Sequence, residues 1–201
     1  MKKYTIQTLI LIFAFSSCNN ESNIKTTDTV CSEPSLKEYN IGEKWLWLEK
    51  SVAEGKIRWE GKELLEVVDF DNNLGFWNGH DTVLVSTNLN QKQGSTPFRD
   101  WPLKVGKKWK YESEWNNSEG TSMKTSQDVE VVSYGEVVVL AGRFMAYKIE
   151  HKGTFSNSMG GSGKMNDTYW YAPALKTNIK HTQDDGYGSY ILELYDYKSG
   201  Q

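Results

Sequence analysis

The chain has 201 residues, with 23 basic and 26 acidic side chains and a formal net charge of −3 at pH 7. Binding to nucleic acid needs a clearly basic face, so this mild acidity excludes nucleic acid from the expected partners. Two cysteines are too few for a disulfide framework, and an aromatic content of 13% suits half-buried strands as well as ligand-facing surfaces.

The first eighteen residues have the pattern of a secretory signal. Two lysines at positions 2 and 3 precede an apolar run from Leu9 to Phe15, and two serines then lead to Cys18. A run this short cannot cross a bilayer as a helix, which needs about 20 apolar residues. The segment resembles the signal of bacterial lipoprotein precursors. The resemblance implies that residues 1–17 are removed as a signal peptide and that Cys18 is acylated, in part with palmitate.

Residues 18–38 are rich in Asn, Ser, Thr, Lys and Glu, and we expect them to form a lipidated flexible tether. With Cys18 acylated, Cys31 has no intramolecular partner. The acidic chain lacks the basic patches that bind anionic lipid, so the membrane is expected as a partner through the lipid alone. The resemblance also implies a role for the lipoprotein export machinery. Asn19, in place of the aspartate that favours inner-membrane retention, indicates the outer membrane, on its periplasmic face.

The remainder, residues 39–201, is predicted to be a β domain. Short apolar or alternating runs are separated by clusters of Gly, Asn, Asp and Ser, and no apolar spacing of helical period competes with them. The predicted strands cover residues 45–48, 64–70, 82–86, 108–115, 128–134, 136–140, 144–151, 167–171, 176–182 and 189–197. We interpret Gly135 as the turn of a hairpin. The pattern predicts an all-β fold with an antiparallel curved sheet, either a half-barrel or a sandwich.

One sequence pattern occurs twice. Ile41–Trp47 and Val105–Tyr111 both read apolar, Gly, charged, Lys, Trp, any residue, aromatic, at a spacing of about 64 residues. The glycine supplies a turn, and the Trp-x-aromatic pair then points two rings to one face of a strand. The repeat is explained either by a duplicated β unit with halves 39–100 and 101–201, or by chance in an aromatic-rich chain.

The second half resembles a broad group of uncharacterised, secreted bacterial β-proteins. The residues that carry the resemblance are Trp101–Trp109, Ala141–Phe144 and Tyr169–Lys176. It implies a curved antiparallel sheet of the half-barrel type used by periplasmic lipoprotein carriers, and it supplies no catalytic residues. Within it, Pro173 cannot donate a hydrogen bond to a neighbouring strand, so we expect the strand before it to end there.

The sequence contains no recognisable catalytic or metal-binding set. His80, His151 and His181 are far apart, with the last two expected near strand ends, and no Gly-x-Ser-x-Gly motif occurs. The acidic residues at 69–71 and 184–186 could bind calcium, but solvated turns explain them better. We therefore predict a non-enzymatic protein without metal or cofactor.

Three functions are compatible with these features. The leading hypothesis is an envelope lipoprotein whose curved sheet binds a hydrophobic ligand or a partner protein of the envelope. The alternatives are a glycan-binding surface lipoprotein and a hydrolase on a β scaffold. Five aromatic residues are candidates for lining the binding surface, although each could instead belong to the core: Trp45, Trp47, Trp109, Tyr111 and Trp170.

Overall fold

The computed structural model describes residues 29–90, 94–116 and 120–201. The predicted signal peptide, the lipidation site Cys18 and residues 18–28 of the tether lie outside these described residues. Among the helices that the structure describes, none is long and apolar enough to cross a membrane.

Strands dominate the described part of the chain, as the sequence predicts. They are β1 (Lys44–Ala53), β2 (Lys56–Phe70), β3 (Asn73–Trp77), β4 (Thr82–Leu84), β5 (Lys108–Asn116), β6 (Ser122–Val139), β7 (Gly142–Asn157), β8 (Ser162–Ala172), β9 (Thr177–Asp184) and β10 (Ser189–Lys198). The short helices are η1 (Leu36–Glu38), α1 (Val85–Asn90) and η2 (Pro173–Leu175). β8 ends directly before Pro173, as expected for a residue that lacks a backbone donor.

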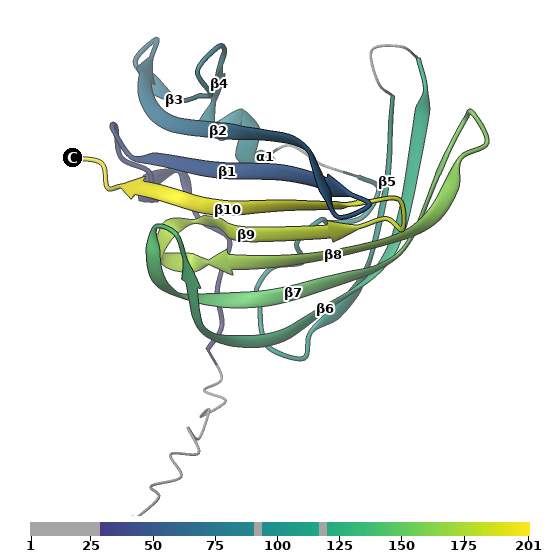
Figure 1. The fold of residues 1–201 in the computed structure, drawn as a ribbon. Coiled ribbons are helices and arrows are strands. Elements are labelled where there is room, and N and C mark those ends of the chain that lie inside the picture. Colours follow the sequence, from purple (N-terminus) through teal and green to yellow (C-terminus); the bar gives the residue numbers. More distant parts are fainter. Residues whose placement is uncertain (1–28, 91–93, 117–119) are drawn as a thin grey trace, which may run out of the picture.

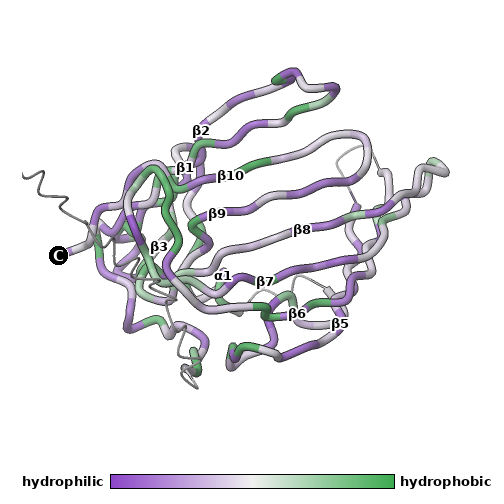
Figure 2. Tube along the Cα trace, turned by 60° about the horizontal axis from the view of Figure 1, so that its bottom comes forward, coloured by the Kyte–Doolittle hydropathy of each residue, from purple (hydrophilic) through white to green (hydrophobic). Residues whose placement is uncertain are grey.

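The strands form one antiparallel sheet in the order β4-β3-β2-β1-β10-β9-β8-β7-β6-β5. Two consecutive meanders, β1–β4 and β5–β10, are joined where β1 pairs with β10. The sheet curves so that β5 lies behind the other strands, on the same side as α1 (Figure 1). Figure 2 shows β10 to β6 side by side in one layer, with mixed hydropathy along each strand. The predicted curved sheet is therefore confirmed in its open form, and the sandwich alternative is wrong.

Two predicted boundaries differ from the structure. Gly135 lies inside β6 and pairs with Ala146, and the chain reverses at Leu140 and Ala141 instead. The long ladder between β6 and β7 keeps Gly135 in extended backbone, so the glycine is not needed for a turn. The strand predicted over residues 82–86 ends at Leu84, because Val85 begins α1 and is fully buried in the core.

The end of the predicted tether belongs to the folded domain. Cys31 and Leu103 exchange two backbone hydrogen bonds of 3.0 and 2.8 Å, and the Tyr147 hydroxyl donates to the Thr29 carbonyl at 2.8 Å. Leu103 is completely buried, so the backbone beside it needs internal hydrogen-bond partners. The predicted boundary is therefore corrected, because residues 29–38 belong to the folded domain. Among the described residues, Cys31 is a free thiol.

The repeated sequence pattern is also a repeat of local structure. Gly42 and Gly106 have φ angles of +84° and +86°, which favour glycine. The N–H of Gly42 donates to the carbonyl of Val67 at 2.7 Å, and that of Gly106 donates to Val131 at 2.8 Å. The lysine two residues after each glycine pairs with a glutamate of the next strand, at 3.1 and 3.2 Å. Both copies therefore fix the start of a strand in the same way.

Candidate ligand-binding cleft

Two segments cover part of the concave face of the sheet. We call them the covering segments: residues 29–43, and residues 85–107 apart from 91–93. Phe98, Trp101 and Leu103 pack on the aromatic and aliphatic side chains of β5 to β8. Tyr39 and Val85 pack with side chains of β1 to β3. The covering segments thus pack on one face of the sheet, in the place that a second sheet would take in a sandwich.

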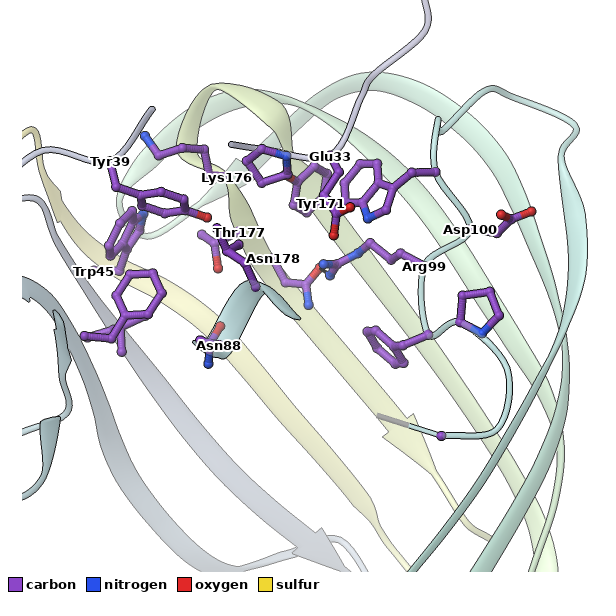
Figure 3. A pocket seen from close by; sticks show the side chains of 18 of the residues that line it. Glu33, Tyr39, Trp45, Asn88, Arg99, Asp100, Tyr171, Lys176, Thr177 and Asn178 are labelled. Carbon is purple, nitrogen blue, oxygen red and sulfur yellow. Dashed lines mark hydrogen bonds between the residues drawn. The ribbon is translucent and has the colours of Figure 1, made fainter. Parts of the chain in front are cut away.

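Between these segments and the sheet lies a cleft of about 720 Å³. This volume falls in the range of about 300–1,000 Å³ that is typical of small-molecule sites. Its walls come from residues 33–39, α1 and residues 94–101, together with β1 to β3, the end of β8 and the start of β9. Figure 3 shows side chains from the sheet and from both covering segments pointing into the same space.

One end of the cleft is aromatic. Tyr39 and Phe76 meet edge to face at 5.3 Å, and each ring lies 6.4 Å from that of Trp45. The indole Nε1 of Trp45 donates to the Leu175 carbonyl at 3.1 Å, which fixes the ring against the end of η2. Leu65 extends this apolar wall. The polar atom of Trp45 is thus satisfied within the fold, and the ring, which is only 1% exposed, belongs to the core beneath this end of the cleft.

The opposite end of the cleft holds Arg99. Its guanidinium donates to Asn178 Oδ1 and stacks on the ring of Tyr171 at 4.5 Å from the centroid. Its Nε is buried and has no hydrogen-bond partner. Burial lowers the pKa of Arg99, and the groups that oppose this shift are three tyrosines and Cys31, not a carboxylate. Arg99 therefore brings a cation into the cleft, and no described carboxylate forms an ion pair with it.

A buried ion pair closes the aromatic end from the side. Lys176 Nζ lies 2.6 Å from Glu43 Oε1, and the two side chains are only 10% and 2% exposed. The Tyr197 hydroxyl donates to the same carboxylate oxygen at 2.9 Å. The ammonium also lies 5.3 Å from the ring centroid of Tyr39. The charge of Lys176 is therefore neutralised within the fold, unlike that of Arg99.

A polar cluster lies elsewhere on the concave face, centred on Asp167 of β8. Its carboxylate accepts hydrogen bonds from Gln127 at 2.7 Å and Gln183 at 3.1 Å, and it meets His181 Nε2 at 2.8 Å. Burial favours a higher pKa for Asp167, but the hydrogen bonds from His181 and the two glutamines outweigh it and lower the pKa. The His181 ring stacks on Tyr169 at 4.1 Å. The cluster is therefore an internally satisfied network.

His151 of β7 lies beside this cluster, opposite Asp167 in the ladder with β8. The rings of Phe98, Tyr111 and Tyr169 surround it, with centroids 5.0–5.8 Å away. Its Nδ1 is buried without a hydrogen-bond partner, and burial lowers the pKa of His151 to about 4. The imidazole is thus held neutral in an aromatic cage.

The structure corrects the expected placement of the histidines. His151 and His181 both lie in mid-strand, and the register of β7, β8 and β9 brings them to either side of Asp167. Thirty residues of sequence separate them, so only the strand pairing reveals their proximity. The described residues contain no group of three or more histidine, cysteine or acidic side chains placed to hold a metal ion.

The five predicted aromatic residues occupy different places. Trp45 lines the cleft. Trp47 and Tyr111 are buried in the two core clusters, and Trp109 packs against the second of these clusters. Trp170 lies on the opposite face of β8 from Tyr169 and Tyr171, with Lys180 at 5.6 Å from its ring. The structure thus brings one of the five into the cleft and does not gather the others there.

Comparisons with known proteins bear on the fold. A protein described as a lipoprotein from Parabacteroides distasonis has a solved structure with a TM-score of 0.51 at 10% identity, covering 84% of this chain and 99% of that chain. An exported protein with a YmcC-like fold from Bacteroides fragilis gives a TM-score of 0.39 at 13% identity, covering 85% and 100% of the two chains. The hypothetical lipoprotein YmcC from Escherichia coli gives 0.39 at 7% identity, covering 83% and 93%.

The first of these likenesses shows a shared fold. It confirms the predicted resemblance to bacterial β-proteins of the lipoprotein type at that level, and sequence identity this low carries no function. No family model matches the sequence, and the search of curated proteins finds no match.

Proposed function

We propose that the protein is a lipid-anchored lipoprotein of the outer membrane that binds a hydrophobic ligand in the cleft between the sheet and the covering segments. The observation that carries the proposal is the cleft itself. It has a volume of about 720 Å³, with the rings of Tyr39, Trp45 and Phe76 at one end and polar side chains such as Asn88 and Asn178 along the rest. A concave site with apolar walls and a few polar groups is typical of small-molecule binding.

The sequence and the relatives in fold support the envelope location. The signal pattern ends at Cys18, and the Parabacteroides protein that shares the fold is described as a lipoprotein. In this proposal the lipid on Cys18 anchors the mature chain, with its periplasmic orientation set by the export machinery. The residues between Cys18 and Thr29 then join the anchor to the domain. The cleft, rather than a catalytic group, performs the function.

The anchor is tested by metabolic labelling with palmitate. We expect the wild-type protein to incorporate the label and to fractionate with the envelope membranes. The Cys18→Ala variant should remain unlabelled, because acylation needs the thiol. A matched Cys31→Ala variant should label like the wild type. A wild-type protein without label would contradict the anchor.

The cleft is tested by extracting bound ligand from protein purified without detergent and measuring the extract by mass spectrometry. We expect the wild type to yield an apolar compound in a stoichiometric amount. Thr177→Trp should reduce the yield at least several-fold, because Thr177 lines the cleft and the indole would fill it. Val138→Trp is the matched control, since Val138 is 58% exposed and lies outside the cleft. An empty wild-type extract, or equal yields from all three proteins, argues against the proposal.

A further inference from the structure

Arg99 differs from the other two arginines of the chain. Arg58 pairs with Glu54 at 2.9 Å and Arg143 pairs with Glu136 at 2.8 Å, and both are solvent-exposed side chains. Arg99 is the arginine that lies against the core, yet the described residues provide no carboxylate for it. A buried arginine is normally the one that has a carboxylate partner, because removing a charge from water costs most when the charge is unpaired.

The contacts of Arg99 orient its guanidinium without neutralising it. The ring of Tyr171 lies 4.5 Å and that of Phe98 5.4 Å from the guanidinium carbon, and Asn178 accepts one hydrogen bond. Figure 3 shows the side chain extending from the covering segment towards Asn178, with Trp45 and Tyr39 on the other side of the cleft. The Nε of Arg99 is left without an acceptor. A planar donor group held in this way is suited to anionic oxygens.

We propose that the cleft binds an anionic amphiphile, with its carboxylate or phosphate oxygens on Arg99 and its apolar portion against the aromatic end. This inference rests on the proposed function and names the class of ligand. Arg99 is the anchor because Lys176, the other cation of the cleft, is already paired with Glu43. Two carboxylates, Glu33 and Asp100, also line the cleft, and Asp100 pairs with Lys107 at 3.0 Å.

The test measures binding to a chain that begins at residue 18 and carries Cys18→Ala. The described fold starts at residue 29, so this chain contains all of it without the lipid. The probes are dodecanoate, dodecyl phosphate and dodecanol at micromolar concentrations, with acetate and inorganic phosphate as head groups alone. Binding is followed by intrinsic fluorescence, since Trp45 and Trp101 line the cleft, and by calorimetry.

Hydrogen bonds to a charged group contribute about 1.5–3 kcal/mol, which corresponds to an affinity ratio of roughly ten or more. We therefore expect at least one of the two anionic amphiphiles to bind wild-type protein at least about tenfold more tightly than dodecanol. The comparison between dodecanoate and dodecyl phosphate identifies the head group. Arg99→Gln should abolish the preference for the anions over dodecanol. Arg99→Lys should retain part of it, and Arg143→Gln all of it.

The outcomes separate this inference from the proposed function. Equal binding of dodecanol and both anions to the wild type, or a preference that survives Arg99→Gln, overturns the role of Arg99 while the cleft remains a binding site. Tight binding of acetate or phosphate alone overturns the amphiphilic class. If none of the amphiphiles binds, the proposed function fails as well. The wild-type comparison needs no variant, so a misfolded Arg99→Gln protein would not hide the answer.

Discussion

Replacing Lys176 with methionine is expected to lower the free energy of unfolding by roughly 3–5 kcal/mol, the cost typical of removing one partner from a buried ion pair. The Glu43 side chain is only 2% exposed, and one of its oxygens already lacks a hydrogen-bond partner. Without the ammonium at 2.6 Å, only the Tyr197 hydroxyl would stabilise the buried charge. Lys176 has a φ of +56°, and methionine leaves that backbone strain unchanged. Urea unfolding followed by tryptophan fluorescence measures the loss.

Two further variants identify the cause. The double variant Glu43→Gln with Lys176→Met should recover more than half of the loss, because no buried charge is then left unpaired. Lys44→Met removes an ion pair at the start of β1 whose side chains are 41% and 27% exposed. Exposed pairs contribute about 0–1 kcal/mol, so this control should change stability little. Equal losses in the single and the double variant would show that the pair is not responsible.

Glu43 also shows where the two copies of the sequence repeat diverge. The equivalent residue of the second copy is Lys107, which meets Asp100 at 3.0 Å on a covering segment. The turn and the shared face of the two rings were predictable from the glycine and the alternating aromatics, since these depend on local backbone preference. The charge partners differ: Glu43 pairs with Lys176, 133 residues away, whereas Lys107 pairs with Asp100, seven residues before it. Pattern alone does not specify such partners.

The strands were largely predictable, and the face that each side chain occupies was not. Alternation of period two places Trp170 and Tyr171 on opposite faces of β8, but it does not say which face is concave. The structure places Tyr171 in the cleft and Trp170 on the other side. The sequence therefore identified aromatic residues as candidates for the binding surface. Which of them line the cleft depends on the curvature of the sheet.

The cleft itself could not be predicted from the sequence pattern. Arg99 lies between Phe98 and Asp100 in a stretch without strand or helix periodicity. Its burial depends on the covering segments folding over the sheet, and hence on contacts between residues far apart in sequence, such as Arg99 with Asn178, 79 positions away. The chain has three arginines. Two of them pair with a glutamate four or seven residues earlier in the sequence, and Arg99 does not.

Acidification between pH 7 and pH 4 is expected to destabilise the fold by about 3 kcal/mol through His151 alone, at 1.36 kcal/mol for each unit of pKa difference. Burial lowers the pKa of His151 from 6.5 to about 4, with Arg99 and His181 adding to the shift and Asp167 opposing it. Because the folded pKa is the lower one, the unfolded chain takes up the proton first. Stability is therefore fully present above pH 6.5 and declines as the pH falls towards 4.

The His151→Phe variant isolates this contribution. Phenylalanine fits the aromatic cage of Phe98, Tyr111 and Tyr169, and it replaces a ring whose Nδ1 has no hydrogen-bond partner. Urea unfolding at pH 7, 5.5 and 4 should show a much smaller decline in stability for this variant than for the wild type. Asp167, whose lowered pKa removes stability only at more acidic pH, remains in both proteins. His80→Phe, at an exposed position outside the sheet, should keep the wild-type decline. An unchanged decline in His151→Phe would mean that another group takes up the proton.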